Sequence, residues 1–152
     1  MTERPELREK PVHMLIWVAF FVVSVIPRVV YGPFLFPIPL VAALAIGSVV
    51  LFLGLVVWWN WSKLWREKAE GQLVTGGLYR HVRHPHYLSI IVISLGVTFL
   101  MQSLIFLICT LFTSLALFKE AQKEERLLTE IFGAQYREYM DKVRWRFIPR
   151  VI

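Results

Sequence analysis

Residues 76–87 read GGLYRHVRHPHY, a polar and basic segment between two long apolar runs. Pro85 suits the first turn of a helix, because its missing N–H costs nothing there and its φ angle is already helical. We therefore expect a helix to begin at Pro85, with Arg83 and His84 at its N-terminus. The positive end of that helix, together with Arg80 and Arg83, predicts a site that attracts a carboxylate or phosphate.

The composition indicates a membrane protein. The chain has 152 residues, 57% of them hydrophobic, and a mean hydropathy of +0.56, too apolar for an ordinary soluble domain. The net charge of +6 is concentrated beside apolar segments, which suits membrane lipids. No stripe of basic residues alternates with an aromatic platform, so we expect no nucleic-acid partner. The single Cys109 excludes an intramolecular disulfide. We expect one membrane domain over residues 1–152.

Two apolar runs precede the basic segment and predict two transmembrane helices within residues 1–70. The first extends from His13 to about Val30 and follows a stretch of mixed charge, so we expect a retained helix and not a signal peptide. The second, residues 38–59, carries no charge and is long enough to cross a hydrocarbon core of about 30 Å. The run ends in a group of tryptophans, which predicts an interfacial anchor, with ligand stacking as the alternative: Trp58, Trp59, Trp61 and Trp65.

Residues 84–118 contain no Lys, Arg, Asp or Glu, and a single helix of this length would be about 50 Å long. Because that is too long for one crossing, the run predicts a hairpin of two helices, Tyr87–Leu100 and Leu104 to about Phe118. The turn would lie at residues 101–103. Such a hairpin returns the chain to the side of the basic segment.

Beyond Phe118 the chain is charged but keeps apolar residues at three- and four-residue steps, which predicts an amphipathic helix along the membrane interface, interrupted near Gly133. Residues 144–150 alternate basic and apolar side chains and predict an anchor at the headgroup level. The expected fold is therefore all-α: a polytopic membrane protein with about four transmembrane helices, including a C-terminal helical hairpin, and an interfacial amphipathic C-terminal helix. The basic loop predicts cytoplasmic N- and C-termini and a cytoplasmic active site.

Two adjacent acids, Glu124 and Glu125, follow the last apolar run. One interpretation is a solvated face on which they pair with Lys123 or Arg126. The other is a carboxylate that points inward toward hydroxyl or amino donors, because a carboxylate beside a membrane is costly unless it is solvated or paired. In the second case an acidic helix end and the cationic helix start would hold a zwitterion between them. An ordinary positive-inside loop is the alternative for the basic segment.

Five motifs follow one another in the C-terminal half of the chain: QLVTGGLY at 72–79, RHPHY at 83–87, EERLL at 124–128, FGAQYREY at 132–139 and IP at 148–149. Together they resemble the isoprenylcysteine carboxyl methyltransferase and phospholipid methyltransferase superfamily of integral membrane methyltransferases. The second motif alone is moderately specific, whereas its combination with the third and fourth at this spacing is strongly so.

The resemblance implies an enzyme that transfers a methyl group from S-adenosylmethionine to a lipophilic or lipidated substrate, which would enter from the bilayer. Residues 71–152 would form the cofactor-binding core, and we expect no metal. We assign catalytic roles to Arg83 and Tyr136. The residues expected to bind the cofactor are Gln72, Leu73, Val74, Tyr79, His84, Pro85, His86, Tyr87, Glu124 and Glu125.

These residue types suit the chemistry that the resemblance implies. A helix start with Arg83 suits the carboxylate of the cofactor, and Glu124 suits a polar N–H or O–H donor. Methyl transfer is an in-line displacement, so the protein contributes mainly positioning, exclusion of water and electrostatics.

The sequence also departs from the family pattern. Only two predicted helices precede the motifs, where the eukaryotic members have more, and this small size favours a prokaryotic inner membrane. Glu120 stands where those members carry an Arg implicated in substrate binding. An acid there repels a carboxylate and favours a neutral or cationic acceptor, such as a phospholipid amine. Three other arginines are candidates to replace the missing one: Arg126, Arg137 and Arg144.

Two further function classes stay open at this point. Membrane sterol reductases resemble the family through a related pocket for NADPH, which makes reduction the second enzymatic hypothesis. The non-enzymatic hypothesis is a small helical membrane protein that binds a lipid or a partner and uses the motifs for topology alone.

Overall fold

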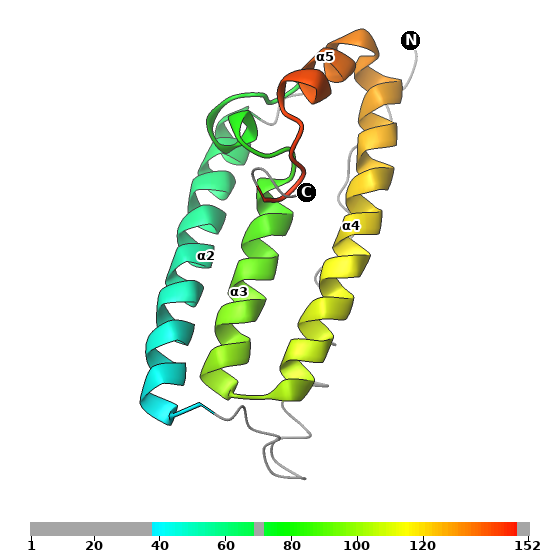
Figure 1. The fold of residues 1–152 in the computed structure, drawn as a ribbon. Helices are drawn as coiled ribbons and strands as arrows, with labels where there is room; N and C mark the ends of the chain where they lie inside the picture. Colours follow the sequence, from blue (N-terminus) through cyan, green and yellow to red (C-terminus); the bar gives the residue numbers. More distant parts are fainter. Residues whose placement is uncertain (1–37, 69–71, 149–152) are drawn as a thin grey trace.

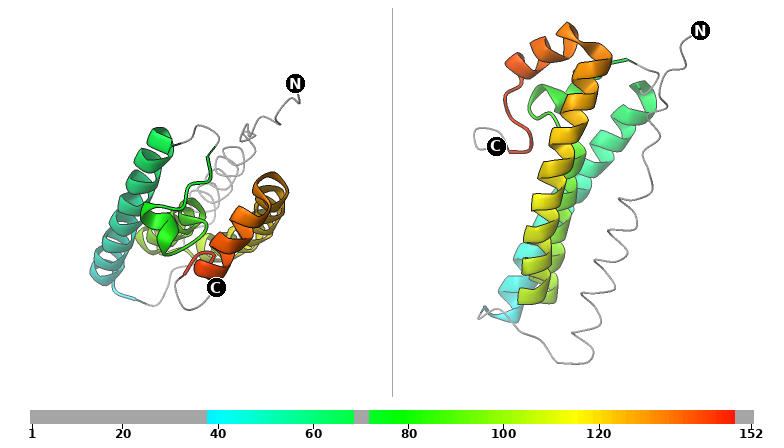
Figure 2. Two further views of the ribbon diagram at one scale, coloured as in Figure 1. Left: turned by 90° about the horizontal axis from the view of Figure 1, so that it is seen from above. Right: turned by 90° about the vertical axis from the view of Figure 1, so that its right-hand side faces the viewer.

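The structure is a computed structural model that describes residues 38–68 and 72–148. Every regular element in these residues is helical, so the all-α prediction is confirmed for them, whereas the predicted helix His13–Val30 lies outside them. In chain order the elements are α2 (Leu40–Lys68), the 3-10 helix η1 (Gly77–Arg80), α3 (Pro85–Met101), α4 (Leu104–Phe132) and α5 (Ala134–Lys142). Helix α3 lies between α2 and α4, and α5 follows α4 at one end of the molecule (Figures 1 and 2).

Helix α2 is longer than predicted. It begins at Leu40 and continues to Lys68, where the apolar run alone suggested an end near Trp59. Neither Gly nor Pro occurs between Trp59 and Gly71, so nothing in the sequence breaks the helix where its apolar character ends. The extension carries the last turns of α2 to the level of the basic segment.

Helices α2 and α3 approach each other through glycines. A Cβ atom on Gly96 of α3 would lie 2.5 Å from the backbone nitrogen of Leu51, and one on Gly54 of α2 would lie 2.8 Å from that of Ile93. Real Cβ atoms do not approach backbone this closely. Small residues at such crossings let two helix backbones pack directly, which is a common means of association between membrane helices.

The predicted hairpin is confirmed, with its turn at Gln102 and Ser103. Gln102 adopts a left-handed conformation with φ of 48°, which glycine usually adopts at the end of a helix. Its side-chain amide donates to the carbonyl oxygen of Ile38 at 3.1 Å, and Ser103 caps α4 by accepting from the backbone N–H of Phe106. Side-chain hydrogen bonds therefore fix a turn that contains neither Gly nor Pro.

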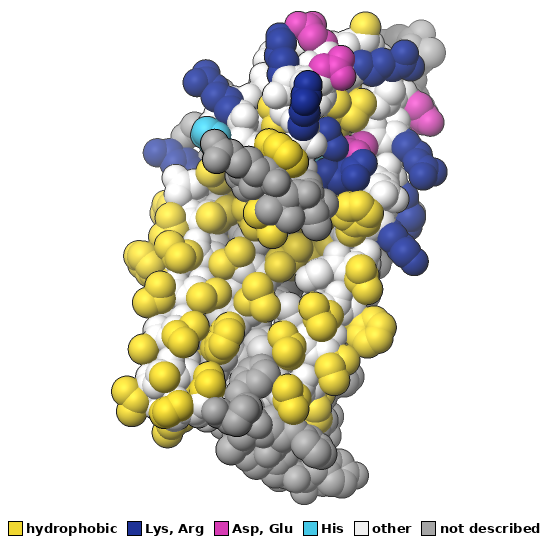
Figure 3. All heavy atoms as spheres, viewed as in Figure 1, with side chains coloured by type: hydrophobic (Ala, Val, Ile, Leu, Met, Phe, Trp, Pro, Cys, Tyr) yellow, Lys and Arg dark blue, Asp and Glu magenta, His cyan; other side chains and the backbone are white. Residues whose placement is uncertain are grey.

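Among residues 38–68 and 72–148, two helices are long and apolar enough to cross a membrane, α2 over Leu40–Leu64 and α4, while α3 is a shorter apolar helix. Large apolar side chains are exposed along α2 and α4, and Lys, Arg, Asp and Glu gather at the end of the molecule that carries α5 (Figure 3). Helix α4 does not end near Phe118, as the loss of apolar character suggested, but runs unbroken into this charged end.

The predicted interruption at Gly133 is confirmed. Its φ of +56° ends α4, a conformation that favours glycine, and α5 leaves in a new direction (Figure 1). Helix α5 is amphipathic as predicted, because Tyr136 and Tyr139 are buried while Arg137 and Glu138 are exposed.

Candidate functional site

The site is built around His84, the residue that precedes α3. Pro85 occupies the first turn of that helix, which confirms the predicted start. The His84 ring is buried, with the whole residue 1% exposed. Both of its nitrogens face carboxylates of α4: Nδ1 lies 3.3 Å from Oε2 of Glu124, and Nε2 lies 3.3 Å from Oε1 of Glu125. The hairpin thus brings together the two motifs that the sequence singled out.

The protonation of His84 reflects this environment. Burial, the largest single influence, lowers the pKa of His84, but the adjacent carboxylates of Glu124 and Glu125 outweigh it and raise this pKa above its ordinary value of 6.5. The charged imidazolium is therefore favoured between the two acids.

Glu125 is the centre of a buried ionic network and is 7% exposed. Its Oε1 accepts from Nε of Arg83 at 2.8 Å. Nε of Arg146 donates to both carboxylate oxygens at 3.1 Å, and Nη2 of the same residue donates to Oε2 at 3.0 Å. Three cationic side chains, His84 included, thus surround one carboxylate. The interpretation of Glu125 as part of a solvated face is wrong, and Lys123 pairs instead with Glu120 at 3.1 Å.

Glu124 has a different environment from its neighbour. Its side chain is 37% exposed, yet its Oε2 is buried and, within the described residues, accepts no hydrogen bond. The contact of this atom with Nδ1 of His84 has ion-pair distance only. The side chain of Glu124 also interacts with Tyr87. Because a buried carboxylate oxygen normally accepts hydrogen bonds, Oε2 of Glu124 keeps unused acceptor capacity at the edge of the network.

Arg83 binds other parts of the protein. Besides Glu125, it donates from Nη1 to the carbonyl oxygen of Val143 at 3.1 Å, and its side chain is almost completely buried. The structure therefore does not present Arg83 to a ligand carboxylate, the role for which its charge suggested it. Arg80, the other predicted anion ligand, is exposed.

A second group of site residues surrounds Tyr79. Its hydroxyl accepts from Nε1 of Trp61 at 3.0 Å, and its carbonyl oxygen accepts from the hydroxyl of Tyr139 at 2.8 Å. The Trp61 ring stacks on His86 with 5.2 Å between centroids. Since Trp61 is buried, its interpretation as an interfacial anchor is wrong, whereas Trp58 and Trp59 are exposed.

Tyr136, predicted as catalytic, lies in this second group. It packs with Tyr139 and Val143 in a buried cluster that Leu73 and Tyr79 cover. Burial raises the pKa of Tyr136 well above its usual range, so its phenol is protonated at neutral pH and can serve as a donor but not as a base. Of the neighbouring predicted residues, Val74 is half-buried and Gln72 is exposed.

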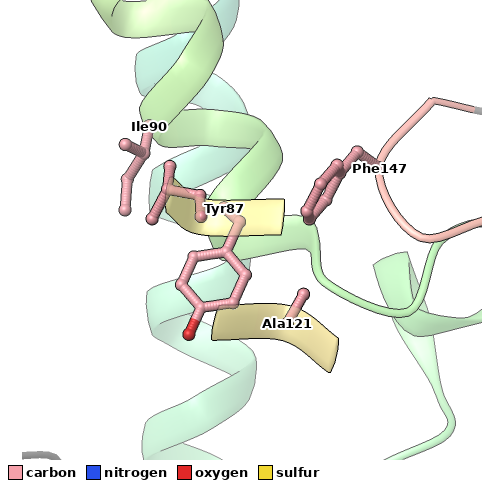
Figure 4. Packing of buried hydrophobic residues seen from close by; sticks show 5 residues of the cluster. Tyr87, Ile90, Ala121 and Phe147 are labelled. Carbon is pink, nitrogen blue, oxygen red and sulfur yellow. The ribbon is translucent and has the colours of Figure 1, made fainter. Parts of the chain in front are cut away.

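The C-terminal segment supplies residues that the sequence analysis missed. Residues 144–150 were predicted to anchor in headgroups, but this is wrong for Arg146, which binds Glu125, and for Phe147, which is buried. Phe147 packs with Tyr87, Ile90, Leu117 and Ala121 between α3 and α4 (Figure 4). The sequence offered one signal, the alternation of basic and apolar residues, but this pattern does not distinguish Arg146 from the exposed Arg144.

The described residues contain no group of three or more His, Cys, Asp or Glu side chains arranged to hold a metal ion. Charge in the site comes from carboxylates, guanidinium groups and imidazoles. The arrangement suits the binding of a polar ligand by hydrogen bonds and charge.

The fold and this paired-motif site define a helical membrane protein with a polar site at one end of its apolar helices. The family model described as the isoprenylcysteine carboxyl methyltransferase (ICMT) family matches residues 38–130, which contain α2, α3, His84, Glu124 and Glu125. The chain belongs to this family.

A curated relative and a solved structure show how much of the chain resembles known members of the family. The chain is 37% identical over 75 residues to the protein-S-isoprenylcysteine O-methyltransferase of Schizosaccharomyces pombe, a match that covers 47% of this chain and 30% of that protein. A solved structure of the eukaryotic intramembrane Ras methyltransferase ICMT superposes with a TM-score of 0.66 at 23% identity and covers 96% of this chain and 55% of that one. The chain thus spans much less than the full length of these relatives.

Proposed function

We propose that this protein is a methyltransferase that transfers the methyl group of S-adenosylmethionine to a lipophilic acceptor in the membrane. The observation that carries the proposal is the meeting of His84 with Glu124 and Glu125 inside the region that matches the ICMT family. The S. pombe relative is named for methylation of an isoprenylated cysteine, so the family supports the class of reaction, and the geometry around His84 supports the proposed site.

The residues present fit the cofactor at its donor groups. S-adenosylmethionine carries hydroxyl, amino and sulfonium groups, and the unused acceptor Oε2 of Glu124 suits one of its N–H or O–H donors. Arg83 does not suit its carboxylate while Glu125 holds the guanidinium. We therefore propose Glu124 and the residues around His84 as cofactor ligands and place Arg83 behind them. Tyr136 acts here as a protonated phenol.

When bound, the cofactor supplies an activated methyl group for in-line displacement by the acceptor. The protein holds both reactants in line and excludes water. His84, charged between Glu124 and Glu125, keeps the two carboxylates at fixed positions. No nucleophilic side chain is required, and an amine acceptor would have to lose a proton to a nearby base or to water.

Titration calorimetry of the detergent-purified protein with S-adenosylhomocysteine tests the proposal. We expect saturable binding that weakens at least about ten-fold in Glu124→Gln, because hydrogen bonds to charged groups are among the stronger ones. Glu130→Gln is the matched control, since Glu130 is an exposed acid of the same helix. A folded protein that binds no S-adenosylhomocysteine would refute the proposal, and binding of NADPH instead would support a reductase.

The acceptor class follows from two features. The exposed apolar faces of α2 and α4 suit an acceptor that arrives through lipid. Glu120 is exposed and paired with Lys123, so no arginine occupies the position that carries one in carboxylate-methylating members. We propose an amine of a phospholipid as the alternative to a prenylated cysteine. The release of S-adenosylhomocysteine with each acceptor in turn distinguishes them.

We further propose that the charged end of the molecule faces the cytoplasm, in a prokaryotic inner membrane. The concentration of Lys and Arg at that end supports this orientation (Figure 3). In a Cys109→Ser background, a Thr75→Cys variant should react with a membrane-impermeant maleimide from the cytoplasmic side alone. Labelling from the opposite side would refute the orientation.

A further inference from the structure

The C-terminal segment is attached to the loop before α3 through its backbone. The N–H of Arg83 donates to the carbonyl oxygen of Trp145 at 2.9 Å, and the N–H of His84 donates to that of Arg146 at 2.9 Å. Phe147 then inserts into the cluster between α3 and α4 (Figure 4). Segments about sixty residues apart in sequence are thereby fixed in one register, with Arg146 opposite the side chain of Glu125.

The side chain of Arg146 then completes the coordination of Glu125. It approaches both carboxylate oxygens at 3.0 to 3.1 Å, while its guanidinium lies 5.2 Å from the centroid of the Phe118 ring. Fork-like contacts of this kind fix the plane of a carboxylate, which a single contact does not. The orientation of Glu125 is thus determined by Arg146 on one side and by Arg83 on the other.

The orientation of Glu125 determines that of the neighbouring groups. Oε1 of Glu125 faces Nε2 of His84, and this contact turns the opposite nitrogen, Nδ1, toward Glu124. The two glutamates are adjacent on α4 but differ in their partners. Guanidinium groups hold Glu125, whereas Oε2 of Glu124 keeps unused acceptor capacity. The pair therefore divides into an internal carboxylate and a ligand-facing carboxylate.

We propose that Arg146 is a positioning residue for the cofactor: by holding Glu125 it orients the His84 ring and through it the ligand-facing Glu124. The inference rests on the proposed function and adds to it a role for a residue that lies outside residues 38–130, the region matched by the family. It also assigns Glu125 to the support of the site and leaves cofactor contact to Glu124.

The test compares three variants by titration with S-adenosylhomocysteine and by thermal unfolding. Arg146→Gln keeps the polarity of the side chain but loses its charge, and we expect about ten-fold weaker binding. Arg146→Lys keeps the charge but loses the fork, and we expect it to recover part of the affinity. Lys142→Gln is the control, because Lys142 is an exposed cation at the end of α5, just before this segment, and it should bind like the wild type.

Each outcome of this test either supports or overturns the positioning role of Arg146. Wild-type affinity in a folded Arg146→Gln variant would overturn it, even if the variant unfolds at a lower temperature, since Arg146 would then serve stability alone. If Arg146→Gln does not fold, the lysine variant decides: weakened binding supports the inference and unchanged binding overturns it. Absence of binding in the wild type would instead refute the proposed function, so the two failures are distinguishable.

Discussion

The charged end and the apolar half of the molecule satisfy their buried polar groups in different ways. At the charged end, Glu125 connects the loop before α3, helix α4 and the C-terminal segment through full charges. In the apolar half, Thr98 donates to Ser94 of its own helix at 2.8 Å and reaches Thr110 of α4 at 3.1 Å. At the charged end, ion pairs hold segments that are distant in sequence against one another. In the apolar half, neutral hydroxyls satisfy their hydrogen bonds mainly within their own helix.

The largest effect is expected from Glu125→Ala, which removes the centre of the charged end. It would leave Arg83 buried without its carboxylate, and loss of one partner from a buried ion pair costs about 3–5 kcal/mol. Thermal unfolding in detergent measures the change. Glu120→Ala is the control, because the pair of Glu120 with Lys123 is exposed and should change stability by less than about 0.5 kcal/mol. Equal losses of stability in the two variants would show that the buried ion pairs of Glu125 stabilise the protein no more than the exposed pair of Glu120 does.

The hairpin and the meeting of the two motifs were predictable because local chemistry determines them. Pro85 defines a helix start, and a charge-free run of this length must turn back before Glu124. The left-handed Gln102 was not identifiable, since the side-chain contact with Ile38 that fixes it comes from another segment.

The partners within the site were less predictable. Arg144 and Arg146 have equivalent sequence contexts, and only the three-dimensional register places Arg146 on Glu125. The same holds for Arg83: its charge predicted a ligand anion, but a carboxylate of the protein takes that place. Sequence thus identifies which residues carry charge, whereas the fold determines which charges neutralise one another.

An effect of intermediate size is expected from pH, and only at the charged end. The folded-state pKa of His84 lies above its unfolded value of 6.5. The stability that its charge contributes is therefore fully present below about pH 6.5 and is lost as the pH rises through the raised value. Each unit of pKa difference corresponds to about 1.4 kcal/mol.

Unfolding midpoints measured from about pH 6 to about pH 9 should thus fall in the wild type. They should fall less in His84→Gln, whereas His81→Gln, at an exposed position, should keep the wild-type slope. A His84→Gln variant with the full slope would show that some other group is responsible and that the imidazole between the two acids is neutral.

The smallest effect is expected in the apolar half, from a double-mutant cycle of Thr98→Val and Thr110→Val. Valine keeps the branched shape of threonine, so the cycle removes the contact between the two hydroxyls with little change in packing. Hydrogen bonds between membrane helices contribute about 0.6 kcal/mol on average, because a helix that separates from its neighbour still finds other partners. Thr98 has such a substitute, because its hydroxyl also donates to the Ser94 carbonyl within its own helix. The coupling should therefore be several-fold smaller than the effect of Glu125→Ala. A coupling as large as the effect of Glu125→Ala would contradict this comparison. The hydroxyls of the apolar half would then hold α3 and α4 together as strongly as the ion pairs at the charged end.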